Sequence, residues 1–149
     1  MSIAMSVNVD PNNSKGYNIE KAYEENEVLQ FEKRKSTKGL KIGDIVYIWL
    51  TKPISTFMYK CEVVEIDSKN RIDDTCYCYH PEKRKEYIDF SKGTYSFKLI
   101  SKIDKERQSE VTLETMRKLN LTKMNQVQGS CRDKKHPKMF DYLDEKFQL

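Results

Sequence analysis

Cysteine and histidine side chains at alternate positions are the first feature of this sequence that could do chemistry. Cys76, Cys78 and His80 stand in the run Cys-Tyr-Cys-Tyr-His, and thiolate and imidazole groups are common zinc ligands. Structural zinc sites usually draw on a second paired cluster, and this chain has none. Alternate positions also lie on one face of a β-strand. The sequence therefore favours structural strand residues here, with a metal site as the alternative.

Residues that could carry out catalysis are scarce. The chain has no glycine-rich nucleotide loop, no clustered carboxylates that would bind a metal and no Ser/His/Asp set at a recognisable spacing. His80 and His136 both precede prolines in charged segments, which is typical of exposed turns. We expect a protein that is not an enzyme and that holds no cofactor.

A basic segment near the C-terminus is a candidate for phosphate contacts. Arg132, Lys134, Lys135 and Lys138 occur within a few residues, interrupted by Asp133. Such side chains contact phosphates and position a nucleic acid without reading its sequence. The alternative, a solvated loop, is slightly favoured when the segment is considered alone.

The only tryptophan lies at the end of the most apolar stretch of the chain. Residues 45–50, Ile-Val-Tyr-Ile-Trp-Leu, are apolar on both faces of an expected strand, which predicts a central strand covered on both sides. The stretch is too short to span a membrane as a helix. Pro53 cannot donate to a β-ladder, so the strand should end before it. Trp49 is then placed either in the core or beside a pocket at the strand end.

Bulk properties narrow the class of protein. A chain of 149 residues fits one domain with its own core. Its net charge of +4 suits contact with phosphates without requiring it. The first residues lack the basic start and apolar core of a signal peptide. We therefore expect a cytoplasmic protein whose four cysteines are free thiols.

The remaining pattern alternates short strands with turn signals. Besides 45–50, strands or extended segments are expected over 2–9, 28–31, 57–67, 75–80, 87–90 and 94–103. Helices are expected from Asn18 to about Asn26, from Thr112 to Asn120, briefly within 122–128, and from Pro137 to the end. This order predicts an α+β fold in a single domain over 1–149, with a small antiparallel β-sheet or barrel flanked by helices.

These segments together resemble the EVE domain family of the PUA-like superfamily, related to the YTH and SRA-like base readers. The resemblance covers nearly the whole chain. Its motifs are Tyr17–Tyr23, Gly43–Trp49 followed by Thr51-Lys52-Pro53, Met58–Val63, Val111–Leu121, Gln128-Gly129 and the final helix ending at Phe147.

The resemblance implies a PUA-like β-barrel with a pocket at its rim that holds a modified base taken out of its stack. Carried over by position, the pocket residues are Asn8, Phe31, Trp49, Thr51, Lys52 and Pro53. The two aromatic rings would form a wall, and the Asn8 amide would meet a base edge.

The sequence thus leads to two hypotheses about function. The first is a non-catalytic module that recognises a modified base, with modified cytosine in DNA favoured over RNA. It would be a monomer that does not bind a membrane. It would act beside a nuclease or translocase partner in modification-dependent restriction or defence. The alternative is a protein-interaction adaptor or inhibitor from a mobile element that keeps the fold without the pocket.

Overall fold

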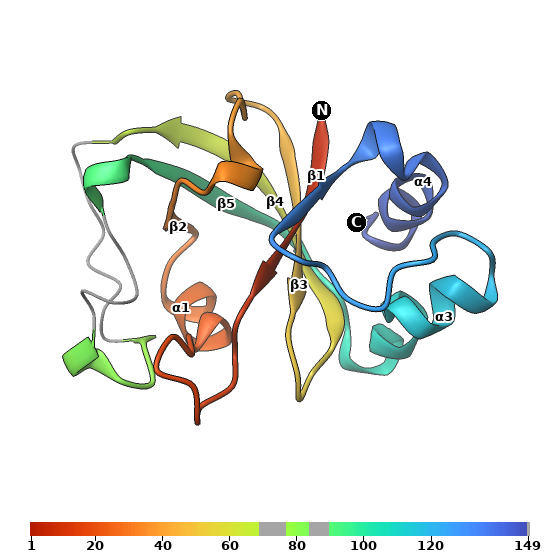
Figure 1. The fold of residues 1–149 in the computed structure, drawn as a ribbon, viewed down its shortest axis with the longest axis horizontal. Coiled ribbons are helices and arrows are strands. Elements are labelled where there is room, and N and C mark those ends of the chain that lie inside the picture. Colours follow the sequence, from red (N-terminus) through yellow and green to blue (C-terminus); the bar gives the residue numbers. More distant parts are fainter. Residues whose placement is uncertain (69–76, 84–89, 149) are drawn as a thin grey trace.

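A mixed sheet of six strands forms the centre of the protein (Figure 1). The structure, a computed structural model, describes residues 1–68, 77–83 and 90–148. The strands lie in the order β2-β5-β4-β3-β1-β6. Their bounds are β1 Ser2–Val7, β2 Val28–Glu32, β3 Ile45–Leu50, β4 Thr56–Ile66, β5 Thr94–Lys102 and β6 Ser130–Arg132.

One pair of neighbouring strands departs from the expected antiparallel arrangement. β1 and β3 run parallel, whereas the other neighbouring pairs are antiparallel. Parallel strands need a long crossover, and here helix α1 (Ile19–Glu25) and β2 lie between β1 and β3 in the chain. The prediction of a purely antiparallel sheet is therefore wrong.

The sheet is also not closed into a barrel, so this part of the prediction is wrong, while the α+β class is confirmed. Its edges are two short strands, β2 and β6. In place of a ladder, side-chain hydrogen bonds connect the segment after β2 with β1 and β6. Arg34 Nη1 donates to the Ser6 carbonyl at 2.8 Å, and Ser130 Oγ donates to the Ser36 carbonyl at 2.6 Å. Only isolated hydrogen bonds form here, because the chain turns into a 3₁₀ helix, η1 (Lys35–Thr37), just after β2 and cannot continue a ladder.

Helices cover both faces of the central strand, as predicted. Helix α4 (Pro137–Lys146) and Phe147 pack on the face that carries Tyr47, whose ring centroid lies 6.1 Å from that of Phe140 and 5.4 Å from that of Phe147. On the opposite face, Tyr23 of α1 packs against Tyr59 of β4 at 5.3 Å. Figure 1 shows α1 on one side of the sheet and α3 (Leu113–Lys118) with α4 on the other.

Capping residues and a proline in the sequence predicted most helix ends correctly. The Asn18 side chain accepts from the Lys21 amide at 3.2 Å, and Thr112 Oγ1 accepts from the Thr115 amide at 3.1 Å. Pro137 occupies the first turn of α4. Asn120 has a φ of 58°, the left-handed conformation that ends helices. The helical turn expected within 122–128 is wrong, since no helix forms there.

Several other segments differ from the secondary structure expected from the sequence. Of the strands expected over 75–80 and 87–90, residues 75–76 and 87–89 lie outside the described residues, Cys78 forms only an isolated bridge with Tyr17, and residue 90 begins a 3₁₀ helix. The sequence pattern did not predict β6 or the 3₁₀ helices. The latter are η1, η3 Pro81–Lys83, η4 Phe90–Lys92, η5 Lys105–Val111 and η6 Asp133–Lys135.

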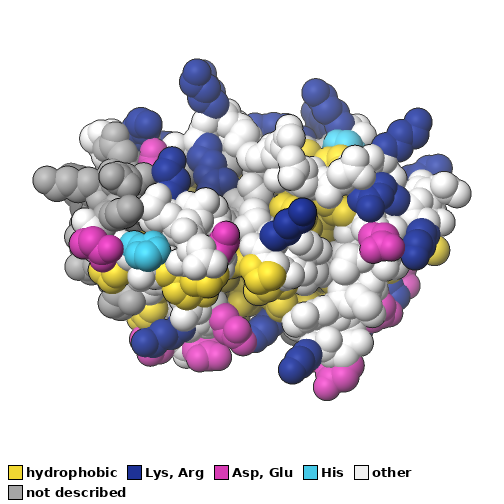
Figure 2. Space-filling model, turned by 60° about the horizontal axis from the view of Figure 1, so that its bottom comes forward, with side chains coloured by type: hydrophobic (Ala, Val, Ile, Leu, Met, Phe, Trp, Pro, Cys, Tyr) yellow, Lys and Arg dark blue, Asp and Glu magenta, His cyan; other side chains and the backbone are white. Residues whose placement is uncertain are grey.

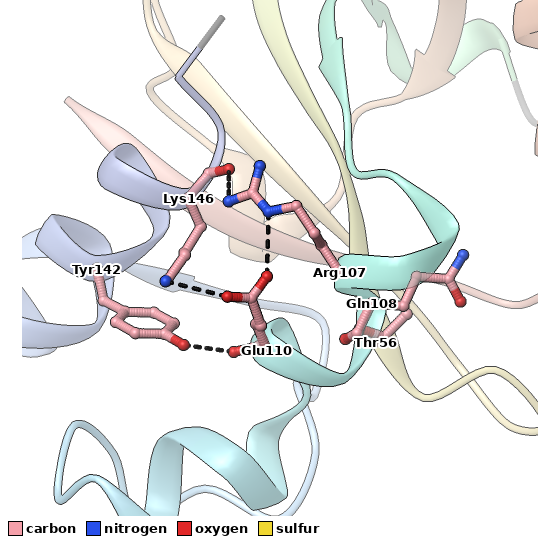
Figure 3. Close-up of polar contacts among 6 residues, drawn as sticks. All are labelled: Thr56, Arg107, Gln108, Glu110, Tyr142 and Lys146. Carbon is pink, nitrogen blue, oxygen red and sulfur yellow. Dashed lines mark hydrogen bonds and ion pairs between the residues drawn. The ribbon is translucent and has the colours of Figure 1, made fainter.

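A cluster of polar contacts fastens η5 to α4 (Figure 3). The Glu110 carboxylate accepts from Arg107 Nε at 3.0 Å and from Lys146 Nζ at 3.2 Å. Arg107 also donates to the Lys146 carbonyl at 2.9 Å, and Tyr142 Oη donates to the Glu110 carbonyl at 2.6 Å. The hydrogen bonds from Lys146 and then Arg107 lower the pKa of the Glu110 carboxyl below its usual value.

Replacing Glu110 by Gln is expected to destabilise the protein slightly at neutral pH. A carboxyl whose pKa is lowered in the folded state stabilises the fold above its unfolded pKa, about 4.3, and loses that effect as pH falls through the folded pKa. Because the side chain is 38% exposed, the contribution should stay below about 1 kcal/mol. Urea denaturation of Glu110→Gln and wild type at pH 7 and pH 3 measures it.

The control is Glu114→Gln, which removes a carboxylate paired with Lys118 alone at 3.4 Å. Its change at pH 7 should be smaller than that of Glu110→Gln. A Glu110→Gln difference that persists unchanged at pH 3 would contradict a role for the ionised carboxylate.

Candidate functional site

A pocket of about 700 Å³ opens where β1 and β3 end. Its walls come from the ends of these strands, the turn at 51–55, the start of α3 and the segment 125–129. We call it the Trp49 pocket. Of the predicted base-binding residues it brings together four, Asn8, Trp49, Thr51 and Lys52.

Trp49 lies in this pocket wall but is 5% exposed. Its backbone pairs with Phe57 of β4, next to an irregularity in the ladder between Ile48 and Trp49. The indole Nε1 is buried and has no hydrogen-bond partner among the described residues. A buried donor without a partner costs roughly 1–3 kcal/mol and is rare in folded proteins. Trp49 is thus both a core residue and a pocket residue, with one unused donor.

Parallel pairing brings Asn8 next to Thr51. The Thr51 amide donates to the Val7 carbonyl at 3.1 Å, and the Val9 amide donates to Thr51 Oγ1 at 3.3 Å. Asn8 Oδ1 accepts from the Asp10 amide at 3.0 Å. No hydrogen bond within the described part of the chain uses Asn8 Nδ2. The pocket wall therefore offers an amide that is fixed by its oxygen and free at its nitrogen.

The other two predicted pocket residues lie apart from these. Phe31 is 9% exposed and packs in the core, with its ring centroid 5.0 Å from that of Phe97 and 6.3 Å from that of Tyr17. Neither Phe31 nor Pro53 is among the residues that line the Trp49 pocket. Pro53 follows a cis peptide bond with Lys52 in the adjoining turn.

The predicted phosphate contacts also lie outside this pocket. Arg132 donates to the Lys38 carbonyl at 2.5 Å and lies 3.0 Å from the Met1 sulfur, so it holds neighbouring segments together. Lys134 is exposed on η6. Lys135 and Lys138 line a separate hollow of about 490 Å³ at the start of α4.

Sequence reasoning missed the side of the pocket that comes from the C-terminal half. Arg117 and Glu114 of α3 line it, together with the amide side chains of Asn125, Gln126 and Gln128. The signals in the sequence were three amide side chains within four residues and the motifs Val111–Leu121 and Gln128-Gly129, to which no pocket role was assigned. A hydrogen bond from the Ser6 amide to the Gly129 carbonyl, 3.0 Å long, holds this segment against β1. Gly129 has a φ of 68° there.

Charges in the Trp49 pocket balance. Asp10 and Glu114 stand with Lys52 and Arg117 in its lining, and Arg117 also donates to the Met124 carbonyl at 2.7 Å. The rest of the polar lining consists of neutral amide and hydroxyl groups. This arrangement suits a neutral, polar, planar guest better than a free anion.

Two of the described thiols, those of Cys61 and Cys131, are not activated nucleophiles. Burial raises the pKa of Cys61 to about 12 and that of Cys131 to about 11, so both stay protonated at neutral pH. Within the described residues no three His, Cys, Asp or Glu side chains gather as metal ligands. Cys78 is buried, His80 bonds the Pro11 carbonyl at 3.0 Å, and Cys76 lies outside the described residues. Over the same residues, no helix is long and apolar enough to cross a membrane.

No protein-family model matches the chain, and no curated protein matches it. Solved structures do resemble its fold. A point mutant of the ASCH protein from Zymomonas mobilis matches with a TM-score of 0.58 at 10% identity, over 99% of each chain. A second ASCH structure from that organism gives 0.53 at 11% identity, over 94% of each chain.

Human THYN1, solved in complex with DNA that contains 5-methylcytosine, matches with a TM-score of 0.52 at 9% identity, over 99% of this chain and 98% of that one. At such identities the likeness concerns the fold alone. The fold of this chain is therefore similar to that of the ASCH and THYN1 structures.

Substitutions of Trp49 should separate its two roles. Trp49→Ala removes a buried ring and should cost about 3–5 kcal/mol of stability. Trp49→Phe keeps much of the apolar volume and removes the unpartnered N–H, so its cost should not exceed about 2 kcal/mol. Denaturation followed by circular dichroism measures both variants. Equal costs for Phe and Ala would mean that the indole N–H is satisfied in the folded protein.

Proposed function

We propose that this protein is a non-catalytic nucleic-acid-binding domain, of the EVE type within the PUA-like superfamily, that takes one modified base into the Trp49 pocket. The observation that carries this proposal is the buried, unpartnered Nε1 of Trp49 beside a pocket of about 700 Å³. A donor left unsatisfied in the free protein gains a partner if the pocket wall shifts and exposes it to an acceptor atom of an entering base.

The size and polarity of the pocket support a base as the guest. Ligand sites of proteins commonly measure about 300–1,000 Å³, and the lining charges cancel. Asn8 Nδ2 and the amides of the 125–129 segment can bond a base edge, where both donors and acceptors alternate. These groups give the discrimination that a purely apolar pocket lacks.

The energy balance requires several contacts acting together. Unstacking a base costs a few kcal/mol. Because Trp49 is only 5% exposed, its ring provides a floor and a donor and not an open stacking surface. Hydrogen bonds to buried groups, each worth roughly 0.5–1.5 kcal/mol, must supply the rest.

The modified base that we favour is a modified cytosine in DNA. The resemblance to the EVE family supports this choice, and the THYN1 structure contains 5-methylcytosine DNA. Exposed Lys52 at the pocket, with Lys134, Lys135 and Lys138, would contact phosphates and orient the strand. We expect a monomer, and the same resemblance favours a role beside a nuclease or translocase in defence against modified DNA.

Fluorescence of Trp49 offers a direct test, because it is the only tryptophan in the chain. Oligonucleotides with 5-methylcytosine or cytosine, as DNA and as RNA, are titrated at roughly 50 and 200 mM salt. A base reader should keep its preference for the modified base at both concentrations. Weak binding that ignores the modification and vanishes with salt would favour the adaptor hypothesis instead.

Asn8→Asp sharpens this test. Aspartate keeps the oxygen that accepts from the Asp10 amide but replaces the free donor Nδ2 with an acceptor. We expect preference for the modified base to fall about tenfold, the effect of roughly 1.4 kcal/mol. The matched control is Asn12→Asp, which adds the same charge at an exposed side chain of the neighbouring loop that does not line the Trp49 pocket.

The non-catalytic part of the proposal has its own test. Labelled DNA and RNA are incubated with the protein, with and without a divalent metal ion. Unchanged substrate is expected, and cleavage or base release that tracks the purified protein would contradict a purely binding role.

A further inference from the structure

A second hollow, of about 500 Å³, lies on the other side of the turn at 51–55. We call it the Tyr79 hollow. Three tyrosines line it, Tyr17, Tyr59 and Tyr79, with polar groups that include Asn18 and Gln108. Ile54 lines both this hollow and the Trp49 pocket. One apolar side chain therefore stands between two cavities.

The turn presents Ile54 to the solvent. The side chain is 42% exposed, although the turn that carries it is hydrogen bonded, with the Ile54 and Ser55 amides donating to the Thr51 carbonyl at 3.1 and 3.3 Å. Thr56 Oγ1 donates to the Gln108 carbonyl at 3.0 Å and fixes the start of β4 behind the turn. On the face that Figure 2 brings forward, which carries this turn, hydrophobic side chains reach the surface among charged ones.

Tyr79 supplies an aromatic surface in the second hollow. Its ring is 39% exposed, and its amide donates to the Gly16 carbonyl at 3.1 Å. A Cβ on Gly16 would come within 2.9 Å of Tyr79 Cδ2, so the ring packs closely on the backbone there. The ring is held in place and partly open to solvent, as a stacking surface requires.

The charges around this hollow also balance. Lys102 pairs with Glu20 at 3.3 Å, and Asp104 stands beside Lys105 in the lining. A cavity with tyrosines, amides and no net charge is suited to a nucleobase and not to a phosphate.

We propose that the Tyr79 hollow holds the base next to the one in the Trp49 pocket, with Ile54 between the two bases. This inference rests on the proposed function of the Trp49 pocket. Stacked bases lie about 3.4 Å apart, so a side chain between them prevents stacking, as apolar wedges do in other nucleic-acid complexes. Each base then enters its own cavity, and Tyr79 compensates for the lost stacking contact of the second base.

A single-stranded pentanucleotide of thymidines with one central 5-methylcytosine tests this arrangement. The thymine on its 5′ side or on its 3′ side is replaced by an abasic residue, and binding is followed by Trp49 fluorescence. Loss of one of the two neighbours should weaken binding about tenfold, within the range for one stacked base. Tyr79→Ala should weaken binding of the intact strand by a similar factor and should no longer respond to the abasic replacement.

Ile54→Ala should also weaken binding, whereas Leu119→Ala, at a side chain that is 52% exposed and lines neither cavity, should not. The abasic strands probe wild-type protein and so need no variant to fold. A Trp49 response to 5-methylcytosine that ignores both neighbours would overturn the second cavity's role while leaving the Trp49 pocket intact. Absence of any Trp49 response to the pentanucleotide would overturn both proposals.

Discussion

The parallel pairing of β1 with β3 is the constraint on which the candidate site depends. The two strands are in register from Ser2 opposite Ile45 to Val7 opposite Leu50, so their C-terminal ends leave the sheet at the same edge. The pairing continues into the loops through the Thr51 amide and the Val7 carbonyl. Asn8 and Thr51 thereby become neighbours, although they are far apart in the sequence. An antiparallel arrangement would place the end of β1 at the opposite edge.

Burial of β3 on both faces explains the double character of Trp49. The same packing that places Tyr47 against α4 fixes the strand end from which the indole enters the pocket wall. The ring is held firmly, and its N–H is left without a partner. Buried donors without a partner are rare in folded proteins, and the exceptions are often found at functional sites. In the proposed complex, an acceptor atom of the bound base would offset the cost of that donor.

The short turn between β3 and β4 organises what surrounds this strand end. It carries Lys52 at one cavity and Ile54 between both cavities. The basic side chains at the start of α4 are separate from it, and the cavities themselves are nearly neutral. Under the proposed function, phosphate contacts and base selection would fall to different parts of the surface, so that salt would weaken the first without removing the second.

The sequence by itself determined the local features. Asn18, Thr112 and Pro137 mark helix starts because capping and proline geometry depend only on near neighbours. The apolar run 45–50 identified the central strand, because burial on both faces leaves a continuous apolar pattern. Trp49 could be named as a site candidate because it lies near the end of that run, and Thr51 because the family resemblance places it just after the run.

Only the tertiary structure decided how distant segments meet. Strand direction depends on the crossover between β1 and β3, and no local pattern encodes it. The short edges β2 and β6 leave the sheet open, since three paired residues in β6 carry too weak a signal to be seen in the sequence. Arg117 and the 125–129 segment reach the pocket through contacts such as that of Gly129 with Ser6. Phe31 was named for its aromatic ring, but packing against Phe97 commits that ring to the core. A pocket forms where separate segments meet in space, and the sequence alone does not give the distances between those segments.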